Sequence, residues 1–110
     1  MMSNTEKEIA DHLASLIVFT VPKVEDYQDA IQRQVDATAM AKKFNDGVTL
    51  ASYSNSTNVI WQAQSVTFIA WRDAVWQFAY AELERVMTGQ RPQPTVSEFL
   101  AELPAIIWPE

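Results

Sequence analysis

This 110-residue sequence contains no cysteine, two glycines and one histidine, and each shortage excludes a kind of site. Without cysteine there is no disulfide, thiolate nucleophile or zinc–thiolate centre. Two glycines cannot build a glycine-rich phosphate loop, and the single histidine, His12, is poor material for Ser–His catalysis or a metal site. We find no nucleophile beside a base and no paired carboxylates in an apolar setting. We therefore expect a protein that is not an enzyme and holds no metal or cofactor.

Basic residues are also scarce, because 8 Lys and Arg stand against 14 Asp and Glu, a net charge of −6. Binding to a phosphate backbone depends largely on Lys and Arg, so we expect no nucleic-acid partner. No apolar run approaches the twenty or so residues that span a bilayer. The first residues lack the basic and apolar regions of a secretory signal. These absences predict a soluble cytoplasmic protein with no membrane partner.

The most informative stretch that is present runs from Asn58 to Met87. It contains no proline or glycine, and good helix formers mix with aromatic residues at spacings of three and four. Asn58 or Thr57 is suited to cap its start, and Gly89 to end it. The pattern predicts one long helix over about residues 58–88.

A helical wheel divides this long helix into two sides. The apolar sector holds Ile60, Trp61, Phe68, Trp71, Val75, Phe78, Ala79, Leu83 and Val86. The opposite side holds Gln62, Asp73, Gln77 and Glu84 with alanines between them. Because one neighbouring helix covers only about a third of a helix surface, so wide a sector needs two packing partners. Another chain is a candidate for one of them.

Shorter helices are expected on both sides of the long one. A capping box at Thr5 opens an amphipathic helix over residues 5–17. A second helix should run over residues 22–44, stopped by Asn45-Asp46-Gly47. A second capping box at Thr95 opens a last short helix that ends before Pro104, and the apolar residues after it should form a docked tail. We expect an all-α single domain over 1–110, with three to four helices around the long central helix and an extended C-terminal tail.

Six side chains are the candidate protein-binding residues: Trp61, Phe68, Trp71, Arg72, Trp76 and Trp108. The three tryptophans of the long helix could form an aromatic groove, although such spacing is more typical of core. Arg72 suits either stacking on a tryptophan at an interface or bonding to backbone carbonyls inside the fold, and Asp73 should pair locally. Trp108 is equally suited to docking on its own chain and to anchoring on another.

Residues from about Gln34 to Pro109 resemble a family of small helical domains in tail-fibre and tail-fibre-assembly proteins of tailed bacteriophages. The first blocks that carry this resemblance are Leu50-Ala51-Ser52-Tyr53, Ser56-Thr57 and Ala70-Trp71-Arg72-Asp73-Ala74-Val75-Trp76. The later blocks are Gly89-Gln90-Arg91, Pro94-Thr95, Glu102-Leu103-Pro104 and Trp108-Pro109. Family members often have a glycine near Lys43 and a proline near Val59, and this sequence has neither. Residues 1–33 match nothing in the family, so they constitute a protein-specific N-terminal helix and crossing.

The resemblance implies a phage structural or assembly role. We expect a tail-fibre-associated protein, either an assembly chaperone or a small virion component, that binds a fibre or baseplate protein through an apolar helical surface. The alternative is a homo-oligomeric tail module without chaperone activity. The corresponding locations are the host cytoplasm during assembly and the virion tail.

Overall fold

The computed structural model describes residues 21–110, which are helical apart from their connections and tail. The elements are α2 (Val24–Ala41), α3 (Gly47–Ala51), the 3₁₀ helix η1 (Ser52–Asn55), α4 (Val59–Met87) and α5 (Val96–Glu102). No strand occurs between residues 21 and 110, and the expected all-α fold with one long central helix is confirmed. The helix expected over residues 5–17 lies outside the described residues.

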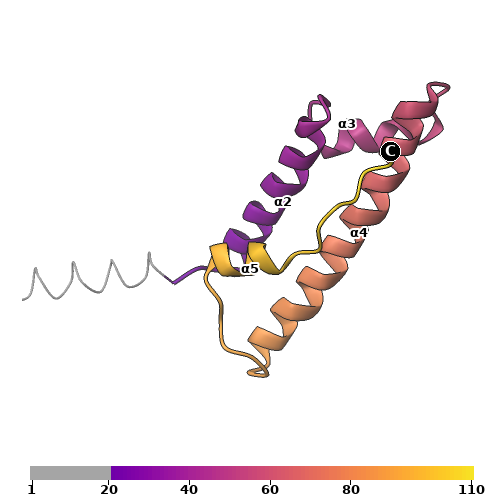
Figure 1. Cartoon of the computed structure of the whole chain (residues 1–110). Helices are drawn as coiled ribbons and strands as arrows, with labels where there is room; N and C mark the ends of the chain where they lie inside the picture. The colour runs from indigo at the N-terminus through magenta and orange to yellow at the C-terminus, as the bar shows by residue number, and fades with distance from the viewer. Residues whose placement is uncertain (1–20) are drawn as a thin grey trace, which may run out of the picture.

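The two long helices, α2 and α4, form the frame of the molecule (Figure 1). α3 and η1 connect them at one end and pack against α4. At the other end α5 packs against α2. After α5 the chain turns back and runs along α4 as an extended tail, drawn in yellow. The tail therefore fills space between the two long helices that no helix occupies.

The ends of α4 are set by the signals that the sequence shows. The Asn58 carboxamide oxygen accepts hydrogen bonds from the Ile60 and Trp61 amides, both at 3.1 Å. These bonds satisfy two of the amides that a helix start leaves free. At the other end Gly89 has φ +76, a left-handed conformation that glycine adopts without steric cost. The predicted span of 58–88 is confirmed.

The end of α2 differs from the prediction of a helix that continues to Phe44. α2 ends at Ala41. Lys43 then turns the chain with φ +71, in the left-handed region that residues other than glycine rarely adopt. Asp46 does not help to stop α2. Its carboxylate accepts a 2.7 Å hydrogen bond from the Thr49 amide and caps α3.

The core lies where α2, α3, α4 and α5 face one another. Its buried members are Tyr27, Ile31, Val35, Ala39, Leu50, Phe68, Trp71, Val75, Ala79, Leu83 and Phe99. On α2 they recur every four residues, and on α4 every three or four, as expected for one face of a helix. Half-buried apolar side chains of the tail, among them Leu103, Ile106 and Trp108, pack against this core.

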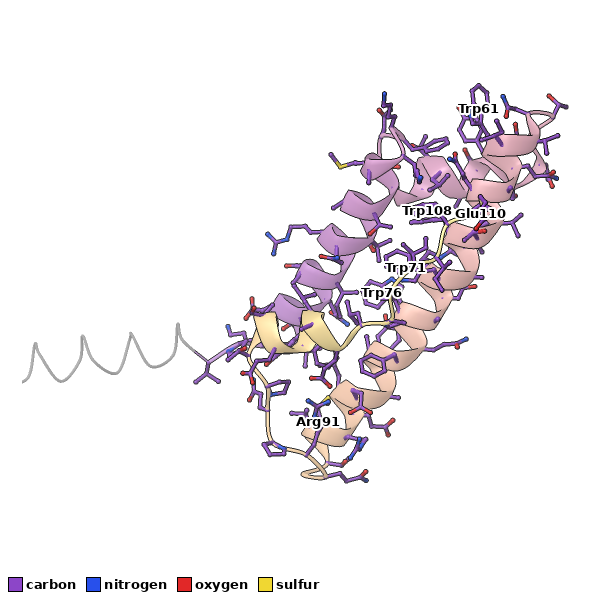
Figure 2. All side chains as sticks on the ribbon, in the orientation of Figure 1. Trp61, Trp71, Trp76, Arg91, Trp108 and Glu110 are labelled. Carbon is purple, nitrogen blue, oxygen red and sulfur yellow. The ribbon has the colours of Figure 1, made fainter. Side chains whose placement is uncertain are left out.

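Four polar contacts join the connector between α4 and α5 to the helices around it. The Tyr27 hydroxyl donates a hydrogen bond to the Pro94 carbonyl, and the Gln93 side chain donates to the Pro22 carbonyl at 2.9 Å. Arg91 lies near the lower end of α4 in Figure 2 and donates to Glu82 of α4 at 2.8 Å and to Glu102 of α5 at 2.9 Å. Together these contacts hold the connector between α4 and α5 in place.

Candidate protein-binding surface

Two of the six predicted binding residues are part of the core. Phe68 is fully buried and Trp71 is 9% exposed. The Trp71 indole N–H donates a 2.7 Å hydrogen bond to the Pro104 carbonyl, so this side chain holds the tail against α4 (Figure 2). Neither residue is accessible to another protein while the tail is docked.

Trp76 and Arg72 lie at the margin of the core. Trp76 is half-buried, and its ring packs against Tyr80 with centroids 5.5 Å apart. The Arg72 guanidinium donates two hydrogen bonds to one carboxylate oxygen of Asp73, from Nε at 3.0 Å and from Nη2 at 2.9 Å. Asp73 thus makes the expected local pair. Among residues 21–110, Arg72 donates to this carboxylate and not to the backbone carbonyls that the sequence suggested.

Trp61 and Trp108 occupy two further environments. Trp61, in the first turn of α4, is 46% exposed and meets Tyr53 edge to face at 5.7 Å. Trp108 is half-buried in the docked tail, where the Lys42 ammonium lies 5.1 Å from its ring centroid. Figure 2 shows Trp61 at the far end of α4 from Arg91. The six predicted residues therefore do not form one continuous surface.

A surface that could bind a protein lies instead on the side of α4 that faces away from the core. Its exposed residues from Val59 to Ala81, which we call the outer face of α4, are Val59, Gln62, Val66, Ala70, Asp73, Ala74, Gln77, Tyr80 and Ala81; Glu84 lies in the same sector just beyond them. On a helical wheel they share one sector of about a third of the circumference. Val59, Val66 and Tyr80 are 76%, 54% and 57% exposed, respectively.

The outer face of α4 carries almost no charge. Asp73 is its only charged member, and the ion pair with Arg72 neutralises that carboxylate. The exposed side of α2, by contrast, carries Glu25, Asp26, Asp29 and Arg33. Solvated helix faces normally hold charged residues, whereas the centres of protein interfaces are depleted of them. The lack of charge thus marks the outer face as a surface suited to burial against another chain.

On the helical wheel this side of α4 lies opposite the apolar sector and contains Gln62, Asp73, Gln77 and Glu84. The alanines between these polar residues were noted, but no binding role was expected of them. Ala70, Ala74 and Ala81 stand at positions where a solvated helix usually has Lys or Glu. Alanine is only weakly apolar on most hydropathy scales, so alanines do not stand out as an apolar sector on a helical wheel.

Between residues 21 and 110, the carboxylates with shifted pKa values form hydrogen bonds that stabilise the fold. A hydrogen bond from the Thr49 backbone lowers the pKa of Asp46, and one from the Thr95 backbone lowers the pKa of Glu98. The Arg91 side chain lowers the pKa of Glu82. Between residues 21 and 110 no three metal-binding side chains gather, and none of the helices there is long and apolar enough to cross a bilayer.

Comparisons with protein-family models, curated proteins and solved structures complete this description. The resemblance to phage tail domains stays a prediction from the sequence blocks quoted above. The surface chemistry of α4 is independent of that resemblance. No family model, curated protein or solved structure matches this chain.

Proposed function

We propose that this protein is a tail-fibre-associated phage protein that binds a fibre or baseplate protein through the outer face of α4. It would act as an assembly chaperone or as a small virion component. The observation that carries the proposal is the exposed and nearly uncharged helix face from Val59 to Ala81. The phage context comes from the sequence resemblance.

The proposed mechanism is burial of apolar surface. The outer face would cover an apolar strip of a fibre subunit, and the free energy gained would scale with the area removed from water at about 25 cal/mol per Å². The alanines let a partner helix approach closely, while Val66 and Tyr80 supply larger contacts. A covered fibre subunit would be prevented from associating wrongly before assembly.

An arginine introduced in the middle of the outer face tests this proposal. Ala74 is exposed, so Ala74→Arg should leave the helix intact and place a charge inside the interface. Co-expressed with the fibre protein encoded beside it, the native chain should raise the soluble yield of fibre. Ala74→Arg should lose this effect, with binding weakened on the order of ten-fold or more.

A matched control is the same substitution on α2. Ala37 is also an exposed helical alanine, but it lies outside the outer face of α4, so Ala37→Arg should behave as the native chain. Equal loss of binding in both variants would refute a role for the outer face. Absence of any tail gene near the coding sequence would remove the support for the phage context.

A second candidate function is the homo-oligomeric tail module, which one feature of α4 favours. Along α4, apolar residues and the ion-paired Asp73 follow one another at alternating spacings of three and four. This is the heptad pattern of helices that wind around each other in a coiled coil. The residues in this pattern are Val66, Ile69, Asp73, Trp76, Tyr80, Leu83 and Met87, of which Leu83 is buried in the protein's own core. Light scattering on the purified protein separates the two functions, because a defined oligomer that Ala74→Arg dissociates would support the module.

A further inference from the structure

A second surface feature lies at the opposite end of the molecule from α5. The chain leaving α2, the helix α3 with η1, and the first turn of α4 surround a pocket of about 390 Å³. It is lined by Lys42, Lys43, Phe44, Asn45, Thr49, Tyr53 and Trp61, and we call it the Trp61 pocket. A volume of this size is near the lower end of the range for small-ligand sites, enough for one or two amino-acid residues.

The walls of the Trp61 pocket are aromatic. Phe44 meets Tyr53 edge to face at 5.2 Å, and Tyr53 meets Trp61 in the same way at 5.7 Å. Such a row presents ring edges and faces on which a further aromatic ring packs favourably, with a gain of about 0.5–1.5 kcal/mol beyond burial of area. An aromatic side chain therefore suits this wall.

The rim of the pocket is cationic although the chain as a whole is acidic. Lys42 and Lys43 both line it, and neither forms an ion pair with any residue between 21 and 110. The nearby carboxylate of Asp46 is engaged by the Thr49 amide at 2.7 Å. The Lys42 ammonium is held in position over the Trp108 ring. An anionic group on the ligand complements this rim.

The backbone conformation of Lys43 gives a second indication that the rim has a function. Its φ of +71 lies in a region that costs a residue with a Cβ roughly 1–2 kcal/mol and glycine almost nothing. A residue kept in a strained backbone conformation at a surface pocket points to a role for its side chain. Glycine at this position would end α2 equally well and would remove the charge.

We infer that the Trp61 pocket binds an acidic–aromatic peptide segment of the partner protein. The aromatic side chain packs on Tyr53 and Trp61, and the neighbouring carboxylate is placed at Lys42 and Lys43. The choice of a peptide over a free acid rests on the proposed function, because Trp61 lies between Val59 and Gln62, at the start of the outer face of α4. A partner lying on that face would reach the pocket with an adjoining segment.

The inference is tested by NMR titration of the isotopically labelled full chain with short peptides. The probe is acetyl-Gly-Asp-Phe-Asp-amide, and the Trp61 indole N–H, assigned with Trp61→Phe, is the reporter. We expect saturable shifts of this signal and of the amides of residues 42–49. A peptide with Lys in place of both Asp residues, and one with Ala in place of Phe, should each bind more weakly by about five-fold or more.

Charge reversal in the protein gives the matching experiment. Lys43→Glu should lower the affinity for the acidic peptide by about five-fold. Lys23→Glu, the same change at the exposed start of α2, should leave this affinity unchanged. No saturable shift at millimolar peptide, or equal binding of the acidic and basic peptides, would overturn the inference. Tighter binding of free N-acetylphenylalaninate than of the peptide would also overturn it, in favour of a small-molecule site. These peptides require no fibre protein, so failure here is distinguishable from failure of the Ala74→Arg test.

Discussion

At the scale of single residues, the four tryptophans have different tasks although three of them share one helix. Trp71 is buried and bonded to the Pro104 carbonyl, whereas Trp76 keeps part of its ring in solvent against Tyr80. Trp61 lines a pocket and Trp108 belongs to the tail. Aromatic content alone therefore does not distinguish a residue of the core from one of a surface.

This difference gives the first expected result. Trp71→Ala should lower the free energy of unfolding by about 3–5 kcal/mol, because it leaves a large cavity and an unpaired carbonyl. Trp76→Ala should lower it by about 1–2 kcal/mol, because less of its area is buried. Urea denaturation of both variants measures the two values. Equal losses would show that Trp76 is as deeply packed as Trp71.

At the scale of elements, the end of α2 gives the second expected result. Lys43→Gly should raise the free energy of unfolding by about 0.5–1 kcal/mol, since the relieved strain exceeds the extra backbone entropy that glycine loses on folding. Gly89→Ala is the reciprocal control at the end of α4. No atom lies within 4 Å of the added Cβ, so its loss of about 1 kcal/mol would reflect the φ of +76 alone. A loss of stability in Lys43→Gly would mean that contacts of the lysine side chain outweigh the strain.

The same two helix ends show how far the sequence predicts the elements. α4 was predicted closely because Asn58 and Gly89 are residues that favour helix ends, and α5 because Thr95 and Glu98 form a capping box. The end of α2 was misplaced because a lysine occupies the left-handed position, which no propensity indicates. Asp46 and Gly47 were assigned to the stop of α2, whereas tertiary packing against α4 makes them the start of α3.

At the scale of the whole molecule, the ion pairs of Arg91 connect α4 to α5 and make stability depend on pH. The hydrogen bond from Arg91 is the main cause of the lowered pKa of Glu82. Hydrogen bonds from backbone amides lower the pKa values of Asp46 and Glu98. A carboxylate with a lowered pKa in the folded state binds fewer protons there than in the unfolded state. Its stabilising effect is complete above the unfolded pKa of about 4 and is lost as the pH falls through the folded value.

We therefore expect the urea midpoint to stay level between about pH 7 and pH 5 and to fall as the pH decreases below about 4.5. Glu82→Gln should make this fall shallower, because it removes one of the three lowered carboxylates. Glu84→Gln is the control, because Glu84 is exposed and lies two residues further along α4. It should leave the dependence of the urea midpoint on pH unchanged. A slope identical in both variants would mean that the Arg91 contacts contribute little to the acid sensitivity.

The candidate surface also depends on the whole molecule, and it was only partly foreseeable. The wheel of α4 identified the side that α2, α3 and the tail cover, including Phe68 and Trp71. The docked tail was expected, but the wheel could not show which part of this sector it covers, because an extended segment has no periodicity to match against a helix. Ile60 and Trp61 at the start of the sector stay exposed, and so does the alanine-rich side. The suitability of that side for a partner becomes visible only when the exposed charges of α2 and α4 are compared.

The contact between Tyr27 and Pro94 has a consequence for the order in which the protein assembles. It joins residues 67 positions apart, with α3 and α4 in the intervening chain. Closing so long a loop is entropically costly until the intervening helices shorten it. The pairing of α2 with α3 and α4 should therefore come first, and α5 should dock as the closing step that locks the frame.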